Sequence, residues 1–221
     1  MATLFDSIGP MLLALLAINV KMTATAIVIA LPIACLFALG RLSRHAAIYY
    51  PVTAYVNLLR SSPLLMILFW AYYTGPMLTG RPSSAYLAAV IALTAFEVAY
   101  LTEIVRTGLQ AIPISQRRAG LATGLTSTQV SRFVILPQAL RKMLPSLLTQ
   151  TIIAFQDSTL ASIIGVPDIA QVTTIVNARE NRPIELYSAL AAIYFAICYG
   201  LSHLVRHVEA RSRQRTAGAR A

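Results

Sequence analysis

The chain has 221 residues, of which 57% are hydrophobic and 12% are charged, and its mean hydropathy is +0.67. This composition excludes a soluble globular domain and predicts an integral membrane protein, because solvated folds carry far more charge. A helix needs about 20 apolar residues to cross a bilayer, so the length predicts roughly five spans in one all-α polytopic domain.

The apolar segments divide the chain into spans and flanks. They predict five spans, of which the first covers about 19–40, the third 85–105 and the fifth 184–205. The second span runs from a helix start at Ser61 or Ser62 to the aromatic cluster of Trp70, Tyr72 and Tyr73. The fourth runs from beyond Pro145 to about residue 166. Residues 1–18 are apolar but contain Gly9 and Pro10, so we expect a short interfacial helix there. Residues 19–208 then form the transmembrane domain, and 209–221 form a basic cytoplasmic tail that contacts lipid.

The basic residues predict the orientation of the spans. A cytoplasmic C-terminus places most of them on that side: Arg41, Arg44, Arg60, Arg106, Arg117, Arg118, Arg132, Arg141, Lys142, Arg206, Arg211, Arg213, Arg215 and Arg220. The other side holds Arg81, Arg179 and Arg182, with Lys21 near its edge. The positive-inside rule therefore predicts the N-terminus out and the C-terminus in, with residues 107–137 in the cytoplasm.

The cytoplasmic segment 107–137 carries the signals of a helical hairpin. Pro113 and Ser115 begin a helix, Gly124 ends it, and Thr126 with Gln129 forms a capping box for a second helix. A helix-turn-helix that reads DNA needs a further helix and freedom to approach a duplex, which a segment held between two spans lacks. We therefore expect no nucleic-acid binding, and a hairpin that docks into a groove of a soluble partner and transmits its motion.

The spacing within this hairpin resembles a known signature. ABC-importer permeases have Glu-Ala-Ala, three residues, Gly, nine residues and Ile-x-Leu-Pro, and the residues at these positions here are Arg118, Ala119, Gly120, Gly124, Val134, Leu136 and Pro137. The flanking segments "NLLRSSPLLMILFW" and "AYLTEIVRTGLQAIPISQ" resemble the polar amino acid uptake branch of that family. "FEVAYLTEI" and "LLTQTIIAFQDSTL" look most like glutamate/aspartate permeases, and the likeness extends from about Lys21 to Glu209.

The resemblance implies a type I ABC-importer permease in a bacterial inner membrane. It implies a second permease subunit, identical or homologous, a separate ATPase that binds ATP and grips the hairpin, and a periplasmic solute-binding protein that delivers polar amino acids, such as glutamate or aspartate. The coupling residues that it indicates are Gln116, Arg118, Ala119, Gly120, Gly124, Leu136 and Pro137. The chain itself has no Gly-x-x-x-x-Gly-Lys-Ser/Thr sequence, so we expect no cofactor in it and no enzymatic activity of its own.

Two residues depart from the signature. Arg118 stands in place of the Glu, so an acidic contact toward the partner is lost. Gly120 stands in place of the second Ala, which predicts a docking helix that is more flexible by roughly 1 kcal/mol. Both changes affect how the hairpin docks.

Polar residues within the predicted spans are candidates for the substrate path, because ionisable groups are costly inside a membrane. These candidates are Glu97, Gln156, Asp157, Ser158 and Thr159. For Glu97 and Asp157, a role in the path and a satisfied helix–helix contact both stay open. Near the cytoplasmic end of the third span, we expect Glu103 to contact Arg106 or the loop.

Two other functions fit the sequence less well than the importer. His203 and His207 share a helical face but lack a third ligand, so we predict no metal site. An ion-coupled secondary transporter would use Glu97 and Asp157 as proton carriers and would need no ATPase. That alternative leaves the hairpin unexplained, and five spans are few for its class.

Overall fold

The computed structural model describes residues 4–82 and 84–218, and every regular element in that part of the chain is helical. The elements are α1 (Leu4–Ala14), α2 (Lys21–Arg41), α3 (Ala46–Ser61), α4 (Leu64–Thr79), α5 (Ala85–Gln110), α6 (Ile114–Ala122), α7 (Ser127–Val130), α8 (Leu136–Asp157), α9 (Ile169–Glu180) and α10 (Pro183–Gly218), with π-helical turns at Leu15–Val20 and Ser131–Ile135 and a 3-10 segment at Ser158–Ile164. The predicted all-α fold is therefore confirmed.

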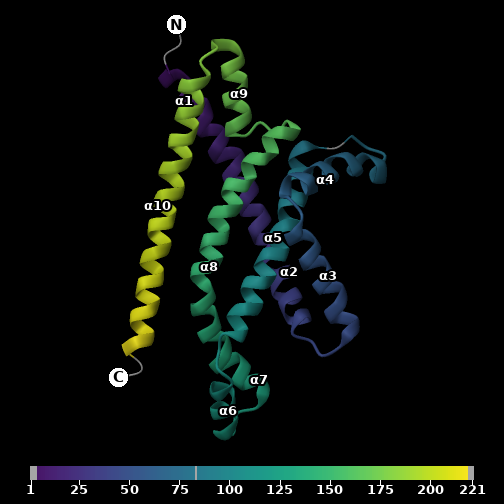
Figure 1. The fold of residues 1–221 in the computed structure, drawn as a ribbon, viewed down its shortest axis with the longest axis vertical. Helices are drawn as coiled ribbons and strands as arrows, with labels where there is room; N and C mark the ends of the chain where they lie inside the picture. Colours follow the sequence, from purple (N-terminus) through teal and green to yellow (C-terminus); the bar gives the residue numbers. More distant parts are fainter. Residues whose placement is uncertain (1–3, 83, 219–221) are drawn as a thin grey trace.

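The spans alternate in direction along the long axis of the molecule (Figure 1). In the part of the chain that the structure describes, four helical segments are long and apolar enough to cross a membrane: Ile8–Arg41, Ala85–Gln110, Ser127–Ile164 and Pro183–His207. The helices α3 and α4 meet at 108° and give a fifth crossing if they count as one broken span. The hairpin α6–α7 lies at the same end as the end of α10, and α1 begins at the opposite end, which fits the predicted topology.

The N-terminal segment is not a separate interfacial helix. The helix α1 continues through the π-helical turn Leu15–Val20 into α2, without a break at residue 18. Pro10 removes one backbone hydrogen bond but does not end the helix, because α9 packs along α1 and supports it. The first candidate span accordingly begins at Ile8 rather than at residue 19.

The second span also differs from its prediction. The helix expected to start at Ser61 or Ser62 starts at Leu64, and Pro63 is its N-cap, without a side-chain cap. Ser62 instead ends α3 and donates a hydrogen bond from Oγ to the carbonyl oxygen of Leu58 at 2.9 Å. The extended backbone that precedes a proline explains why the two helices separate here.

The helix that contains the fourth predicted span begins well before Pro145. The chain is helical from Ser127 to Ile164, and both Pro137 and Pro145 lie inside this stretch. The N–H of Leu136 bonds to the carbonyl of Ser131, five residues back. This wider π-helical turn makes room for the Pro137 ring, which would clash with a carbonyl in a regular α-helix.

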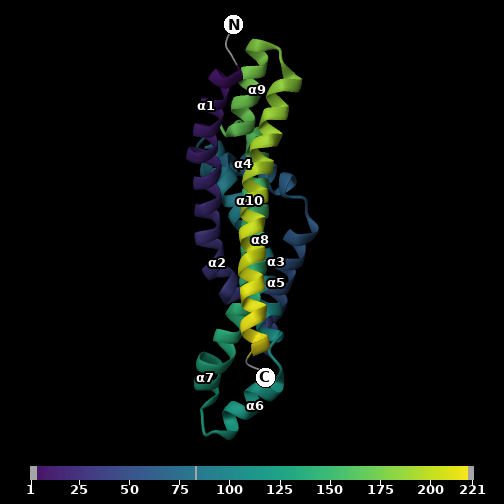
Figure 2. The same cartoon turned by 90° about the vertical axis from the view of Figure 1, so that its left-hand side faces the viewer.

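The central helix is α5, which contacts α2, α3, α4 and α8. Opposite it, every fourth residue of α2 is a fully buried alanine, namely Ala26, Ala30, Ala34 and Ala38. Small side chains let helices approach closely, and van der Waals contact holds them together where lipid removes the hydrophobic driving force. By contrast, only 6% of the apolar window of α10 is buried, and this helix crosses in front of α8 along one side (Figure 2).

Candidate functional site

The hairpin between α5 and α8 forms as the sequence predicts. Pro113 is the N-cap of α6, and Thr123 ends that helix. Gly124 follows with φ +86°, a left-handed conformation that favours glycine. The capping box is present: the N–H of Thr126 donates to Gln129 Oε1 at 2.8 Å, and the N–H of Gln129 donates to Thr126 Oγ1 at 3.3 Å.

Gly120 holds the two halves of the hairpin close together. A Cβ at Gly120 would lie 3.0 Å from Val130 Cγ2, and both residues are buried. The missing side chain therefore permits contact between α6 and α7, in addition to the flexibility that we predicted from the sequence. In this chain, Gly in place of the signature Ala leaves room for the Val130 side chain.

The base of the hairpin is fixed to both spans from which it emerges. Lys142 on α8 donates a hydrogen bond from Nζ to the carbonyl of Ala111, at the end of α5, at 2.8 Å. About one turn before Ala111 on α5, a Cβ at Gly108 would lie 2.9 Å from Met143 Cβ, so α5 and α8 are in close contact. The base of the hairpin is thus joined to α5 and α8 together.

The outer surface of the hairpin is basic and apolar. Of the predicted coupling residues, Gly120 is buried, and the exposed ones are Gln116, Arg118, Ala119, Gly124, Leu136 and Pro137. Arg117 and Arg132 are also exposed, beside the apolar side chains of Ile114 and Phe133. Residues 107–137 contain no Asp or Glu, so this surface suits an acidic partner with an apolar depression.

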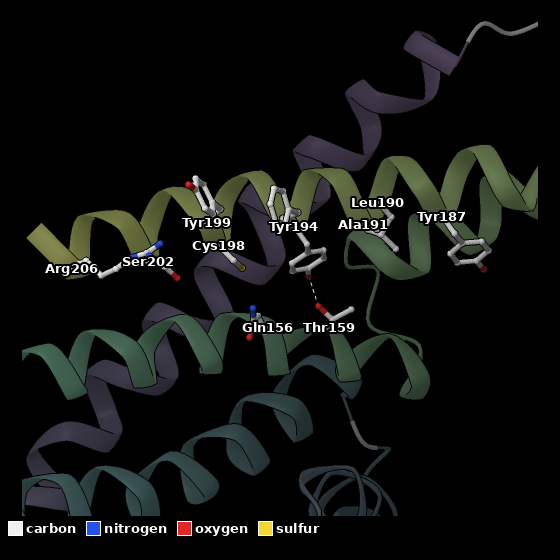
Figure 3. A pocket seen from close by; sticks show the side chains of 11 residues that line it. Gln156, Thr159, Tyr187, Leu190, Ala191, Tyr194, Cys198, Tyr199, Ser202 and Arg206 are labelled. Atoms are coloured by element: carbon white, nitrogen blue, oxygen red, sulfur yellow. Dashed lines mark hydrogen bonds between the residues drawn. The ribbon is translucent and has the colours of Figure 1, made fainter.

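The candidate path residues do not converge on one site. Gln156 and Thr159 line a cavity of about 660 Å³ between α8 and α10 (Figure 3). Tyrosines and an arginine of α10 complete its lining, namely Tyr187, Tyr194, Tyr199 and Arg206. Asp157 lies instead beside Leu64 and Leu68 of α4, and Ser158 is buried.

Arg60 does not lie at the cytoplasmic surface, contrary to our prediction. It occupies the last turn of α3, and its Cζ lies 5.4 Å from the ring centroid of Tyr100 on α5. Tyr100 lies seven residues before the predicted cytoplasmic boundary at residue 107, which is roughly 10 Å along α5 at about 1.5 Å per residue. The guanidinium therefore lies within the predicted membrane-spanning part of the molecule.

Glu103 occupies the predicted position near the cytoplasmic end of α5. Arg41 Nη1 donates to Glu103 Oε2 at 2.6 Å, and Arg106 Nε donates to the same oxygen at 3.0 Å. Glu103 Oε1 accepts a further bond from Arg106. The predicted contact with Arg106 is confirmed, and the same carboxylate ties α2 to α5.

The family described as "Binding-protein-dependent transport system inner membrane component" matches residues 26–214. The chain belongs to this family. It is therefore a multi-pass inner-membrane permease of an ATP-binding-cassette transport system, as the hairpin signature indicated.

Individual relatives and a solved structure agree with this assignment. The chain is 36% identical over 210 residues to the glutamate/aspartate import permease protein GltK of Escherichia coli O6:H1 (strain CFT073). This alignment covers 92% of this chain and 94% of the relative. It is 33% identical over 175 residues to the glutamine transport system permease protein GlnP of Escherichia coli K12, with 79% and 78% covered. A crystal structure of an amino acid ABC transporter with histidines has a TM-score of 0.85 and 30% identity, over 96% of this chain and 99% of that one. The permease is thus a subunit of an amino acid importer with the type I fold.

Glu97 of the permease makes a helix–helix contact. It is fully buried in α5, and Gln150 Nε2 on α8 donates to its Oε1 at 3.1 Å. We predict that Glu97→Gln keeps amino acid uptake within about threefold of wild type, since the amide preserves size and most hydrogen bonding. Uptake in proteoliposomes measures this, and Gln150→Leu serves as a destabilising control because it leaves the buried carboxyl without its donor. Loss of uptake in a normally assembled Glu97→Gln protein would instead support the ion-coupled alternative.

Sequence reasoning missed a polar cluster in the half of the permease opposite the hairpin. Asn19 Nδ2 donates to Ser158 Oγ at 3.0 Å and to Asp168 Oδ2 at 3.2 Å, and the N–H of Ile169 donates to Asn19 Oδ1 at 3.2 Å. All three polar side chains are almost fully buried. Two signals in the sequence could have indicated this cluster. Asn19 stands within an apolar run, and Asp168 stands three residues before Gln171, as an N-cap residue does. In the structure, the N–H of Gln171 donates to Asp168 Oδ1 at 2.9 Å.

This outer cluster fixes the 3-10 segment Ser158–Ile164 against its neighbours. Ser158 bonds to Asn19, and Thr159 bonds to Tyr194 of α10, which also lies 3.4 Å from Asn19 Nδ2. Burial raises the pKa of the Asp168 carboxyl, and hydrogen bonds from the Gln171 N–H and the Asn19 amide oppose that rise. The cluster therefore determines where Gln156 and Thr159 lie in the cavity beside α10.

Proposed function

We propose that the permease imports acidic amino acids, glutamate or aspartate, and that a separate ATPase drives it through the α6–α7 hairpin. A solute-binding protein delivers the substrate at the end of the molecule opposite the hairpin, and a second permease subunit covers the face that this chain leaves open. The observation that carries the proposal is the hairpin itself, which projects beyond the spans and is fixed at its base to α5 and α8 (Figure 1).

The geometry of the hairpin supports a rigid-body mechanism. The close contact between Gly120 and Val130 joins its two halves, and the capping box at Thr126 fixes the turn between them. ATP-driven closure of the ATPase would move this unit as one body, and α5 and α8 would carry the motion into the membrane. Because α5 also packs along the alanine face of α2, the movement would change the packing of the central spans.

The charge of the hairpin supports a specific kind of docking surface. Arg117 and Arg118 are exposed on α6, and no acidic residue occurs between residues 107 and 137. The docking groove on the ATPase is therefore acidic where it faces α6, the reverse of the charge that the signature Glu would require. Ile114 and Phe133 supply the apolar contacts of this interface.

The substrate assignment rests on the relatives. GltK, at 36% identity, is named for glutamate and aspartate import, and GlnP, at 33%, is named for glutamine. Glutamate, aspartate and glutamine are all polar amino acids of similar size. The match to GltK is stronger and covers more of this chain than the match to GlnP, which favours the acidic pair over glutamine.

Reconstitution of the complete importer tests the proposal. Proteoliposomes would contain this chain, its sister permease if one exists, and the ATPase, with the binding protein and glutamate added. We expect glutamate-stimulated ATP hydrolysis and uptake, and about a tenfold loss of both in Arg117→Glu/Arg118→Glu, since reversed charges repel an acidic groove. Arg44→Glu, an exposed charge at the same end but outside the hairpin, is the matched control and should behave as wild type.

Three results would contradict the proposal in different ways. Uptake that continues without ATP and follows a proton gradient would reject the ATP-driven importer. Normal stimulation in the doubly reversed variant would retain the importer but reject the acidic groove. Stimulation by glutamine and not by glutamate or aspartate would reject the substrate assignment alone.

A further inference from the structure

The cavity between α8 and α10 is an open groove with a largely apolar wall. Its volume of about 660 Å³ lies within the range of roughly 300–1,000 Å³ that is typical of ligand sites. The wall on α10 contains Leu190, Ala191, Phe195 and Cys198, and Phe195 is 70% exposed. Since only 6% of the apolar window of α10 is buried, the chain itself leaves this side of the span uncovered.

The charge of the groove lies at its cytoplasmic end. Of the described residues that line the groove, only Arg206 is charged, and it lies at the opposite end from Tyr187 (Figure 3). Arg206 directly follows the predicted span 184–205 and belongs to the last turn of the candidate span Pro183–His207. Its guanidinium Cζ lies 6.0 Å from the ring centroid of Tyr199, so the ring covers one face and leaves the N–H groups along the edge available to a ligand. Among the side chains that the structure describes, no carboxylate forms an ion pair with Arg206.

The sequence around Arg206 does not neutralise this cation. Residues 200–218 contain four arginines and a single acidic residue, Glu209, which follows Arg206 by three residues. An ion pair at this spacing on one helix is weak and depends on salt. This end of α10 therefore carries a surplus of positive charge at the cytoplasmic surface, where it attracts anionic headgroups.

The part of the groove next to Arg206 has the length of one lipid leaflet. Half of a hydrocarbon core of about 30 Å corresponds to roughly ten residues of a helix. An acyl chain that starts beside Arg206 would therefore pass Ser202 and Cys198 and end near Phe195. A phospholipid matches this order, because its phosphate lies at the interface and its acyl chains lie beneath it. A soluble anion would use the cation alone and would leave the apolar wall exposed.

We propose that this groove binds one phospholipid with an anionic headgroup from the cytoplasmic leaflet. The lipid phosphate accepts hydrogen bonds from the Arg206 guanidinium and the Ser202 hydroxyl, and one acyl chain lies along Cys198 and Phe195. The outer part of the groove, next to Thr159, stays free of the lipid. Because the lipid fills the space between α8 and α10, it replaces contacts with protein that α10 lacks. The site is independent of the amino acid that the importer carries.

Site-specific photocrosslinking in the complete permease–ATPase complex tests the proposal. The photoreactive residue p-benzoylphenylalanine replaces Tyr199 in the groove or, as the matched control, Trp70, an exposed aromatic residue of α4. The complex is embedded in nanodiscs of equal parts phosphatidylglycerol and phosphatidylcholine with the same acyl chains, and one lipid at a time is radiolabelled. At Tyr199 we expect about fivefold more crosslinking to phosphatidylglycerol than to phosphatidylcholine, which is the effect of one arginine near a headgroup. At Trp70 the two lipids should crosslink about equally.

Changes of charge identify the group that selects the lipid. Arg206→Gln should reduce the preference at Tyr199 to less than about twofold, whereas Arg206→Lys, which keeps the charge, should retain most of it. Arg44→Gln is the matched control, since Arg44 is exposed at the same end of the molecule but lies outside the groove, and it should leave the preference unchanged.

Three results would overturn the proposal. Equal crosslinking of the two lipids at Tyr199 would mean that ordinary boundary lipid fills the groove. A preference that survives Arg206→Gln would mean that Arg206 does not select the lipid. Crosslinks to a second permease polypeptide in place of lipid would mean that another subunit occupies the groove. The comparison of Tyr199 with Trp70 needs no change at Arg206, so it decides the proposal even if Arg206→Gln does not assemble.

Discussion

Replacing Gly124 by Val is expected to abolish glutamate-stimulated ATP hydrolysis while the protein still inserts and assembles. Gly124 has φ +86°, and a β-branched residue is strongly disfavoured in that conformation. A Cβ at this residue would meet no neighbouring atom within 4 Å, so the substitution acts through the backbone and not through a clash within the chain. The turn between α6 and α7 would open, and the hairpin would lose the shape that docks. We expect the stimulated rate to fall by about tenfold or more, measured in proteoliposomes with ATPase and binding protein present.

The matched control for this substitution is Gly124→Asn. Asn adopts the left-handed conformation more readily than other non-glycine residues, so the turn should persist. Stimulated hydrolysis in this variant should stay within about twofold of wild type. If Val and Asn behave alike, whether both active or both inactive, the conformation of the turn does not control coupling and the rigid-body mechanism is wrong.

The hairpin was predictable because its signals are local. A proline at a helix start, a glycine at a helix end and a capping box are each defined by residues within one or two turns. The structure contains all three, at Pro113, Gly124 and Thr126. The spacing of these residues also carried the resemblance to ABC-importer permeases, which the family match confirms.

Features that depend on three-dimensional packing were not predictable. Hydropathy does not predict α3 or the bend at Pro63, and it therefore places Arg60 at the cytoplasmic surface although this residue lies over Tyr100. Gly120 predicts only flexibility, because the sequence does not show that Val130 lies opposite it. In the same way, Gln156 and Asp157 are neighbours in sequence but face different helices, α10 and α4.

The outer cluster gives the largest expected effect on stability. We predict that Asn19→Leu destabilises the permease by about 3 kcal/mol, because it removes the buried hydrogen bonds to Ser158 and to Asp168 Oδ2 and the acceptor of the Ile169 N–H. Thermal unfolding in detergent should show this as a decrease in Tm of roughly 6–12 °C. Thr25→Val is the control on the same helix, since Thr25 is only half-buried and its hydroxyl donates to the carbonyl of Lys21 within the helix.

The pH dependence of this variant gives a second test. Burial already raises the pKa of Asp168, and loss of the Asn19 amide removes one of the bonds that oppose the rise. A carboxyl whose pKa is higher in the folded protein contributes its stability below the unfolded pKa of about 3.9, and loses it as the pH rises through the folded pKa. The destabilisation by Asn19→Leu should therefore be greater at pH 7 than at pH 5. An equal loss at both values would show that Asp168 does not respond to Asn19.

The same substitution should separate transport from ATP hydrolysis. Asn19 holds Ser158, and Ser158 begins the segment that places Thr159 beside Tyr194 in the cavity next to α10. The hairpin lies at the other end of α8 and keeps its own contacts, so the ATPase should still be stimulated. We therefore expect Asn19→Leu, assayed below its Tm, to hydrolyse ATP at a near-normal rate while uptake falls by about tenfold, because a loosened outer half no longer confines the substrate. Parallel loss of hydrolysis and uptake would mean that the outer cluster and the hairpin move as one unit, and the two halves of α8 could not then be assigned separate roles.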